Sequence, residues 1–144
     1  MKSNNKQEYV AVVIVRKDGS VLIQHRDNLP AIASPDTYAI CGGKKEASDK
    51  SLKAAASREL FEETGYAVKT QELHLLQKDE FDTPTGRVVR NFYWTYYDES
   101  QPIKCLEGQS IEFYEIDKIS ALNFCDPYHK EYLEEAHTRA CQRR

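Results

Sequence analysis

Three glutamates lie within five residues of one another, at the end of a segment whose apolar pattern is helical. Between Ser51 and Thr64 the apolar residues recur at steps of three and four, the spacing of one buried helix face. They are Leu52, Ala55, Ala56 and Leu60. Ser48, Asp49 and Ser51 are candidate N-caps, and Gly65 is placed to end the helix in a left-handed conformation. The sequence therefore predicts a helix over residues 51–64 with one face packed inside the fold.

The other face of this helix is acidic. Glu59, Glu62 and Glu63 stand at i, i+3 and i+4, where like charges destabilise an isolated helix by roughly 0.2–0.5 kcal/mol per pair. They also lie in the last turn, where the helix dipole disfavours negative charge. Arg58 can pair with Glu62, but no basic residue of the helix is four positions from Glu59 or Glu63. A divalent cation would supply the missing charge, and Mg²⁺ prefers carboxylate oxygen. A solvated acidic face is the alternative interpretation.

Strand-like segments lie on both sides of this helix. Runs rich in β-branched and aromatic residues cover about 9–15, 21–24, 73–78, 88–97 and 111–116. The turn Lys17–Ser20 predicts a hairpin between the first two, and Pro30 and Pro35 mark a loop over 27–37. A short apolar segment, 38–41, runs into a glycine pair, and a last helix is predicted from Asp126-Pro127. This order predicts an α/β fold in which helices cover a mixed β-sheet.

The bulk composition limits the classes of function. The 144 residues predict one domain over 1–144, and the formal net charge is −3, from 20 Lys and Arg against 23 Asp and Glu. This balance gives no general attraction to nucleic acid or to an anionic membrane. No apolar run is long enough to span a bilayer, and the polar start, Met1–Glu8, lacks the apolar stretch of a signal peptide. The four cysteines contain no C-x-x-C pair, so reduced thiols and a cytoplasmic location are expected.

At this point the residues resemble the Nudix hydrolase family, whose signature reads G-x5-E-x7-R-E-U-x-E-E-x-G-U, with U a bulky apolar residue. Its second half is filled by Arg58-Glu59-Leu60-Phe61-Glu62-Glu63-Thr64-Gly65-Tyr66, with Tyr66 a loose match. Gly43 fills the opening glycine, so the box spans approximately 43–66. The resemblance implies a Nudix-like α/β/α sandwich, with a mixed β-sheet between helices. It also implies a pyrophosphohydrolase acting on phosphorus anhydrides.

The upstream acid of the signature is the one departure. Five residues separate Gly43 from Asp49, but eight rather than seven then separate Asp49 from Arg58. Counting back from Arg58 places Lys50 where the signature has Glu. We interpret this as a one-residue insertion, in which Asp49 replaces the glutamate and reaches Arg58.

The resemblance also implies roles for the residues of the box. Mg²⁺, with Mn²⁺ as an alternative, would be held by the carboxylates of Glu59, Glu62 and Glu63 and by the Gly43 carbonyl. Glu59 or Glu63 would take the proton from the attacking water, and the sequence does not choose between them. Arg58 would orient the carboxylates. A bound divalent ion neutralises phosphate charge and lowers the pKa of its water.

Residues outside the box complete the predicted site. Many family members add an acid from a later loop; Glu107 is the candidate here, Glu112 is the alternative, and a surface turn glutamate is the plain interpretation. Arg26, and Lys44 with Lys45, could contact phosphate oxygens, although each alone is more often a solvated charge.

Two aromatic regions could border the substrate. The strand with Phe92, Tyr93, Trp94, Tyr96 and Tyr97 has aromatics on both faces, so one face is predicted to be core and the other could stack a base. The region 123–132 often borders the substrate cleft in related enzymes. His129, within it, is interpreted as a surface or capping histidine rather than a catalyst.

The substrate is predicted only as a class. A small-molecule nucleotide, namely a nucleoside diphosphate linked to another group, is expected. A nucleoside triphosphate, intact or oxidised, is the leading form. Nucleotide sugars such as ADP-ribose, dinucleoside polyphosphates, and a nucleotide-sensing module without activity are the alternatives. Dimers are common in the family, so a homodimer is one expected assembly, although the sequence identifies no interface.

Overall fold

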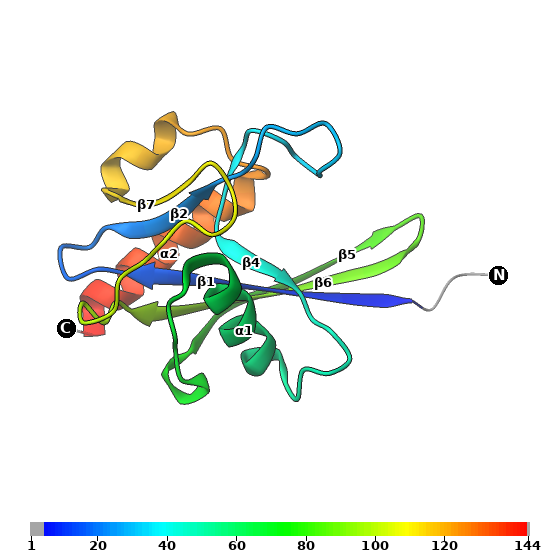
Figure 1. Cartoon of the computed structure of the whole chain (residues 1–144), viewed down its shortest axis with the longest axis horizontal. Helices are drawn as coiled ribbons and strands as arrows, with labels where there is room; N and C mark the ends of the chain where they lie inside the picture. The colour runs from blue at the N-terminus through cyan, green and yellow to red at the C-terminus, as the bar shows by residue number, and fades with distance from the viewer. Residues whose placement is uncertain (1–4, 144) are drawn as a thin grey trace.

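The computed structural model describes residues 5–143; Met1–Asn4 and Arg144 of the predicted domain lie outside the described residues. The strands are β1 (Lys6–Val15), β2 (Val21–His25), β3 (Tyr38–Ala39), β4 (Cys41–Lys44), β5 (His74–Thr83), β6 (Gly86–Tyr96) and β7 (Ser110–Tyr114). The helices are α1 (Leu52–Thr64) and α2 (Pro127–Arg143), with short 3₁₀ turns at Thr70–Glu72 and Ile116–Ala121 (Figure 1). The predicted strands and both predicted helices are present.

The strands form a mixed sheet built around β1. Its order is β3-β2-β1-β6-β5, with β4 paired to β1 and β7 paired to β2. β6 runs parallel to β1 over its full length, and the other pairings are antiparallel. The predicted hairpin joins β1 to β2, with Val15 opposite Val21. β4 pairs with residues 9–12 of β1, which brings the glycine pair 42–43 against the centre of the sheet.

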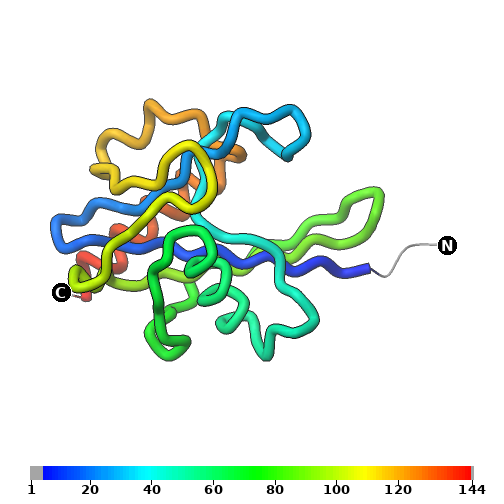
Figure 2. Tube along the Cα trace, in the orientation of Figure 1, coloured from blue at the N-terminus to red at the C-terminus, as the bar shows by residue number. Residues whose placement is uncertain are grey.

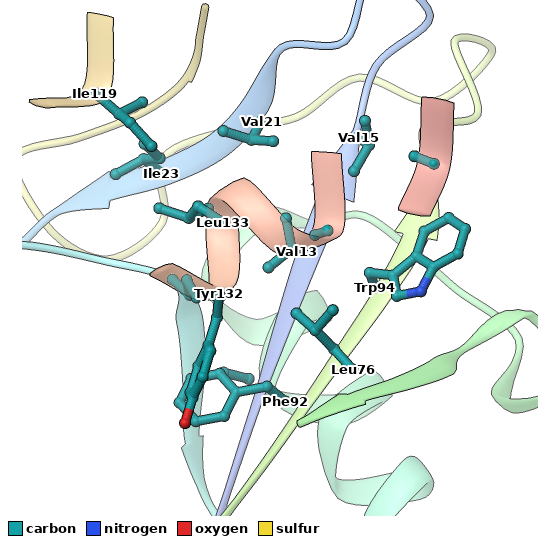
Figure 3. Close-up of a cluster of buried hydrophobic side chains, with 14 residues drawn as sticks. Val13, Val15, Val21, Ile23, Leu76, Phe92, Trp94, Ile119, Tyr132 and Leu133 are labelled. Carbon is teal, nitrogen blue, oxygen red and sulfur yellow. The ribbon is translucent and has the colours of Figure 1, made fainter. Parts of the chain in front are cut away.

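Two cores lie on opposite faces of this sheet. Every residue of β1 from 10 to 15 is buried, and because side chains alternate along a strand, successive residues enter different cores. The core on the α2 side includes Val13, Val15, Ile23, Trp94 and Leu133 (Figure 3). The core on the α1 side includes Val10, Val12, Ile14, Leu60 and Tyr93. Figure 2 shows the path of the chain through the sheet and the helices. The predicted α/β/α sandwich is confirmed.

Helix α1 has the ends that its sequence predicts. The Ser51 side chain accepts a hydrogen bond from the Ala54 backbone N–H at 3.0 Å. Gly65 adopts φ 72°, and its N–H donates to the Phe61 carbonyl at 2.8 Å. A left-handed residue at this position favours glycine because a side chain would be strained there. The helix therefore ends directly after its acidic turn.

Three aromatic residues of β6 are core residues, the interpretation that the sequence favours for each of them. Phe92, Tyr93 and Trp94 are each at most 4% exposed, because helices cover both faces of the sheet. Phe92 and Trp94 enter the α2 core and Tyr93 enters the α1 core. These three side chains therefore pack on both sides of the sheet, and Phe92 also lines the cavity described below.

All four cysteines are free thiols, as the sequence predicts. Within residues 5–143, no helix is long and apolar enough to cross a membrane.

Candidate catalytic site

Glu63 points from α1 into the protein rather than into solvent. The residue is 2% exposed, and its Oε2 accepts a hydrogen bond from Gln24 Nε2 at 2.9 Å. Its Oε1 is buried and has no hydrogen-bond partner among the described residues. Burial, together with the negative charges of Glu107 and Glu59, raises the pKa of this carboxyl to about 8. A buried oxygen without a donor is costly, so this position favours a positive partner.

Glu59 lies directly against the glycine pair of β4. A Cβ atom added to Gly43 would overlap the Glu59 carboxylate, so the missing side chain leaves the space that this carboxylate occupies. Burial raises the pKa of Glu59, and Arg58 opposes that rise. The structure therefore brings Gly43, Glu59 and Glu63 together, as the resemblance predicts.

Asp49 forms a two-pronged ion pair with Arg58. Arg58 Nε donates to Asp49 Oδ1 at 2.8 Å, and Arg58 Nη2 donates to Asp49 Oδ2 at 2.9 Å. The backbone N–H of Glu46 donates to the same Oδ2 at 2.8 Å. The Arg58 hydrogen bonds are the main cause that lowers the pKa of Asp49 to about 2. The prediction that Asp49 reaches Arg58 is confirmed.

The rest of the Arg58 guanidinium is bonded to the carboxylates of its own helix. Nη1 lies 3.0 Å from Glu59 Oε1 and 3.2 Å from Glu62 Oε1, and Nη2 donates to the Lys44 carbonyl. Glu62 is outermost, with 56% of its side chain exposed. The three glutamates were expected to crowd one side of the helix, but their environments differ: Glu63 is buried, Glu59 is largely buried and Glu62 is in solvent.

We expect Asp49→Ala to lower turnover by roughly 10- to 100-fold, the usual cost of losing a residue that orients metal ligands. Without Asp49, the Arg58 guanidinium loses two of its bonds and no longer holds Glu59 in one place. Steady-state assays across metal concentrations would measure this loss. Asp18→Ala is the matched control, because Asp18 also pairs with an arginine, Arg16, far from this site in the fold. Equal losses in both variants would contradict the orienting role.

The loop before β7, residues 97–109, is hydrogen-bonded to α1 and β2. Its backbone N–H groups at Lys104 and Leu106 donate to the carbonyls of Thr64 and Glu63, each at 2.9 Å. Gly108 has φ +92°, and a Cβ there would lie 2.7 Å from the His25 carbonyl. These contacts bring Glu107 close enough for its charge to raise the pKa of both Glu59 and Glu63.

Gln24 is a residue of this site that the sequence analysis missed. Its amide nitrogen donates both to Glu63 Oε2 and to the Glu107 carbonyl, at 2.9 and 3.1 Å, and the residue is 4% exposed. It therefore links the buried carboxylate to the loop. The signal was a polar residue at the end of the apolar run 21–24, on the α1 side of the strand.

We expect Glu107→Gln to lower turnover by about tenfold or more, because the substitution removes one negative charge beside Glu59 and Glu63, the carboxylates expected to hold a metal ion. Glu112→Gln is the matched control. Glu112 was the alternative candidate, but it is exposed on β7. Parallel kinetics of both variants at saturating metal would test the choice, and a larger loss in Glu112→Gln would reverse it.

A cavity of about 350 Å³ opens next to the glycine pair. Its lining includes Arg26, Gly43, Asn91, Phe92, Cys125 and His129. Arg26 donates from Nε and Nη2 to the Ala33 carbonyl, which holds its side chain at this opening. Lys44 does not line the cavity. His129 was interpreted as a surface or capping residue. Instead it is 7% exposed and lines the cavity, because its ring packs against Phe92 and bonds to the Ile40 N–H between β3 and β4.

Comparison with known proteins decides the family. The model of the NUDIX domain matches residues 5–136. The chain belongs to the Nudix family. The prediction of a Nudix pyrophosphohydrolase is thereby confirmed at the level of the family. No curated protein in the comparison matches this Nudix chain.

Solved structures of Nudix proteins share its fold. A MutT protein from Methanosarcina mazei Go1 superposes with a TM-score of 0.76, at 19% identity over 99% of each chain. The Nudix domain of Shewanella oneidensis NrtR, complexed with ADP ribose, has a TM-score of 0.76 at 18% identity, over 97% of this chain and 90% of that one. A bifunctional NMN adenylyltransferase/ADP ribose pyrophosphatase from Francisella tularensis, complexed with AMP and a manganese ion, gives 0.67 at 21% identity, over 99% of this chain and 43% of that one.

The residues of the site fit a divalent cation. The donors gathered here are carboxylate and carbonyl oxygens, which Mg²⁺ and Mn²⁺ prefer. The partnerless Oε1 of Glu63 is the atom that most needs a positive partner, and its carboxyl lies near the negative charges of Glu59 and Glu107.

Proposed function

We propose that this Nudix protein hydrolyses a pyrophosphate linkage in a nucleoside diphosphate derivative, with a nucleoside triphosphate, intact or oxidised, as the leading substrate. One observation carries the proposal. A buried carboxylate oxygen without a partner, on Glu63, lies beside Glu59 and near Glu107, and a cavity opens next to Gly43. Such a site attracts a cation that in turn binds phosphate.

Each residue of the proposed site has a role in this reaction. Glu59, Glu62 and Glu63, with the Gly43 carbonyl, would hold Mg²⁺ or Mn²⁺, which would neutralise phosphate charge and activate water. Arg58 keeps Glu59 and Glu62 in position through the bonds described above. Glu59 or Glu63 accepts the proton of the attacking water. In the metal-free protein, burial raises the pKa of both carboxyls, which makes each a stronger base than a carboxylate in solvent.

The cavity and Arg26 would bind the nucleotide. A volume of about 350 Å³ lies at the lower end of the range for small-molecule sites and suits one nucleoside. This favours a nucleoside triphosphate over a dinucleoside polyphosphate. Arg26, at the opening, and Lys44, at the end of β4, are the candidates for phosphate contact. ADP-ribose derivatives are the second candidate class, since two of the structural neighbours are an ADP ribose complex and an ADP ribose pyrophosphatase.

A substrate panel tests the proposal. Nucleoside triphosphates, their oxidised forms, ADP-ribose and dinucleoside polyphosphates would be incubated with Mg²⁺ or Mn²⁺, and the release of phosphate, pyrophosphate and mononucleotide would be measured. Mononucleotide release from a triphosphate that stops with EDTA is the expected result. Nucleotide binding without turnover on every compound would instead support a sensing module.

Assembly and location belong to the same proposal. We expect a small-molecule substrate, no nucleic-acid or membrane partner, a cytoplasmic location, and a homodimer as one assembly state. Light scattering of the purified protein would give its mass in solution.

A further inference from the structure

His129 has one fixed tautomer in this fold. Its Nδ1 lies 3.0 Å from the Ile40 backbone nitrogen, which can only donate a hydrogen bond. Nδ1 must therefore carry the lone pair, and the neutral ring carries its hydrogen on Nε2. Burial keeps the pKa of this histidine below its ordinary value. Charged groups around the ring modify that effect: Asp126 and Asp79 raise the pKa, and Arg90 and Arg26 lower it.

The Nε2–H of His129 has no acceptor within hydrogen-bond distance in residues 5–143. The nearest carboxylate oxygen, Asp126 Oδ2, is 3.6 Å away and already accepts from Arg90 Nη1 at 2.6 Å. The ring packs edge-on against Phe92, and both residues line the cavity. The ring thus has an N–H at Nε2 that no hydrogen bond within residues 5–143 uses, on a residue that lines the cavity.

The neighbouring Cys125 and Asp126 do not turn His129 into a metal site. Candidate ligand atoms of the three residues lie within 4.8 Å of one another. However, Nδ1 is occupied by the Ile40 N–H and Nε2 carries the hydrogen, so neither ring nitrogen offers a lone pair. The Arg90 guanidinium also already neutralises Asp126. The cluster is therefore better suited to hydrogen bonding than to coordination.

We propose that His129 determines substrate specificity, by donating a hydrogen bond from Nε2 to a ring nitrogen or carbonyl oxygen of the nucleobase. The inference rests on the proposed function, which places a nucleoside in this cavity. A ligand without a base acceptor at that point leaves the buried donor unpaired and binds more weakly. The base, rather than the phosphates, then sets which nucleotide is bound.

Two substitutions separate the hydrogen-bond donor at His129 Nε2 from the bond that Nδ1 accepts from the Ile40 N–H. His129→Asn keeps an oxygen near the place of Nδ1, so Ile40 N–H retains its acceptor, but removes the donor at Nε2. His129→Gln places an amide nitrogen near Nε2 and loses the acceptor for Ile40. The probes are AMP, GMP, CMP and UMP, with ribose 5-phosphate as the base-free reference, all titrated calorimetrically in EDTA without metal. Thermal unfolding of each variant is measured in parallel.

For wild type, we expect at least one mononucleotide to bind more tightly than ribose 5-phosphate. That preference should fall about tenfold in His129→Asn, with a Tm close to that of wild type. It should persist within about threefold in His129→Gln, whose Tm should drop by several degrees. A preference kept in His129→Asn, or no preference in wild type, overturns the inference.

A measurement on the unaltered protein keeps the test independent of how the variants fold. The ring ¹⁵N spectrum should show the Nε2–H tautomer for one histidine, and its proton resonance should move on saturation with the preferred mononucleotide. An Nδ1–H tautomer, or an unmoved resonance, overturns the inference. Absence of turnover on the substrate panel would instead overturn the proposed function alone, because these titrations need no catalysis.

Discussion

Replacing Glu63 by Gln is expected to lower metal-dependent turnover by roughly 10³-fold or more while the protein stays folded. The substitution removes the carboxylate that has a buried, partnerless oxygen and leaves its shape almost unchanged. Gln24 can still donate to the new amide oxygen, so the link to the loop before β7 persists. Single-turnover assays across a range of Mg²⁺ and Mn²⁺ concentrations would measure the loss.

Glu134→Gln provides the control for this experiment. Glu134 is half exposed on α2, and its carboxylate pairs with Lys130 in an ordinary surface contact. The turnover of the Glu134→Gln variant should equal that of wild type. Glu62→Gln should also lose most of its activity if Glu62 holds metal from its exposed position. Full turnover in Glu63→Gln would contradict the assignment of that residue to the metal.

The stability of the metal-free protein is expected to fall as pH rises from about 5 to about 8, by an amount that Glu63→Gln removes. Folding raises the pKa of Glu63 from 4.5 to about 8. Between these values the folded protein holds a proton that the unfolded chain has released, so raising the pH favours unfolding. The slope from this group approaches roughly 1.4 kcal/mol per pH unit, and it disappears outside that window.

The difference between the two proteins isolates this group from the others. Denaturant unfolding of wild type and Glu63→Gln in EDTA, at half-unit pH steps, gives two curves to subtract. The lowered pKa of His129 acts in the opposite direction below about pH 6.5, and it cancels because both proteins contain it. Saturating Mg²⁺ should flatten the wild-type curve, since the ion stabilises the ionised carboxylate. A flat difference curve would show that Glu63 is not buried in the manner described.

Local features of the chain were predictable because they depend on residues close in sequence. Helix α1 follows from its apolar spacing, its cap at Ser51 and its terminating Gly65. The Asp49–Arg58 pair was also predictable, because the loop is short enough to bring Asp49 back to the helix. His129 was misjudged for the opposite reason. Its burial depends on β3 and β4, whose contact with α2 joins positions 89 residues apart.

The sequence by itself determined the family, the order of strands and helices, and the identity of the carboxylates on α1, because periodicity, capping and motif spacing are local properties. Only the tertiary structure decided that those carboxylates have different environments. Glu63 is buried because β2 and the loop before β7 cover it. Gln24 of β2 donates hydrogen bonds both to the Glu63 carboxylate and to the Glu107 carbonyl of the loop. The cavity and the fixed tautomer of His129 also arise from contacts between distant segments, which no local pattern encodes. Helix α1 is therefore specified by sequence, while the electrostatics of its acidic turn are set by the elements packed against it.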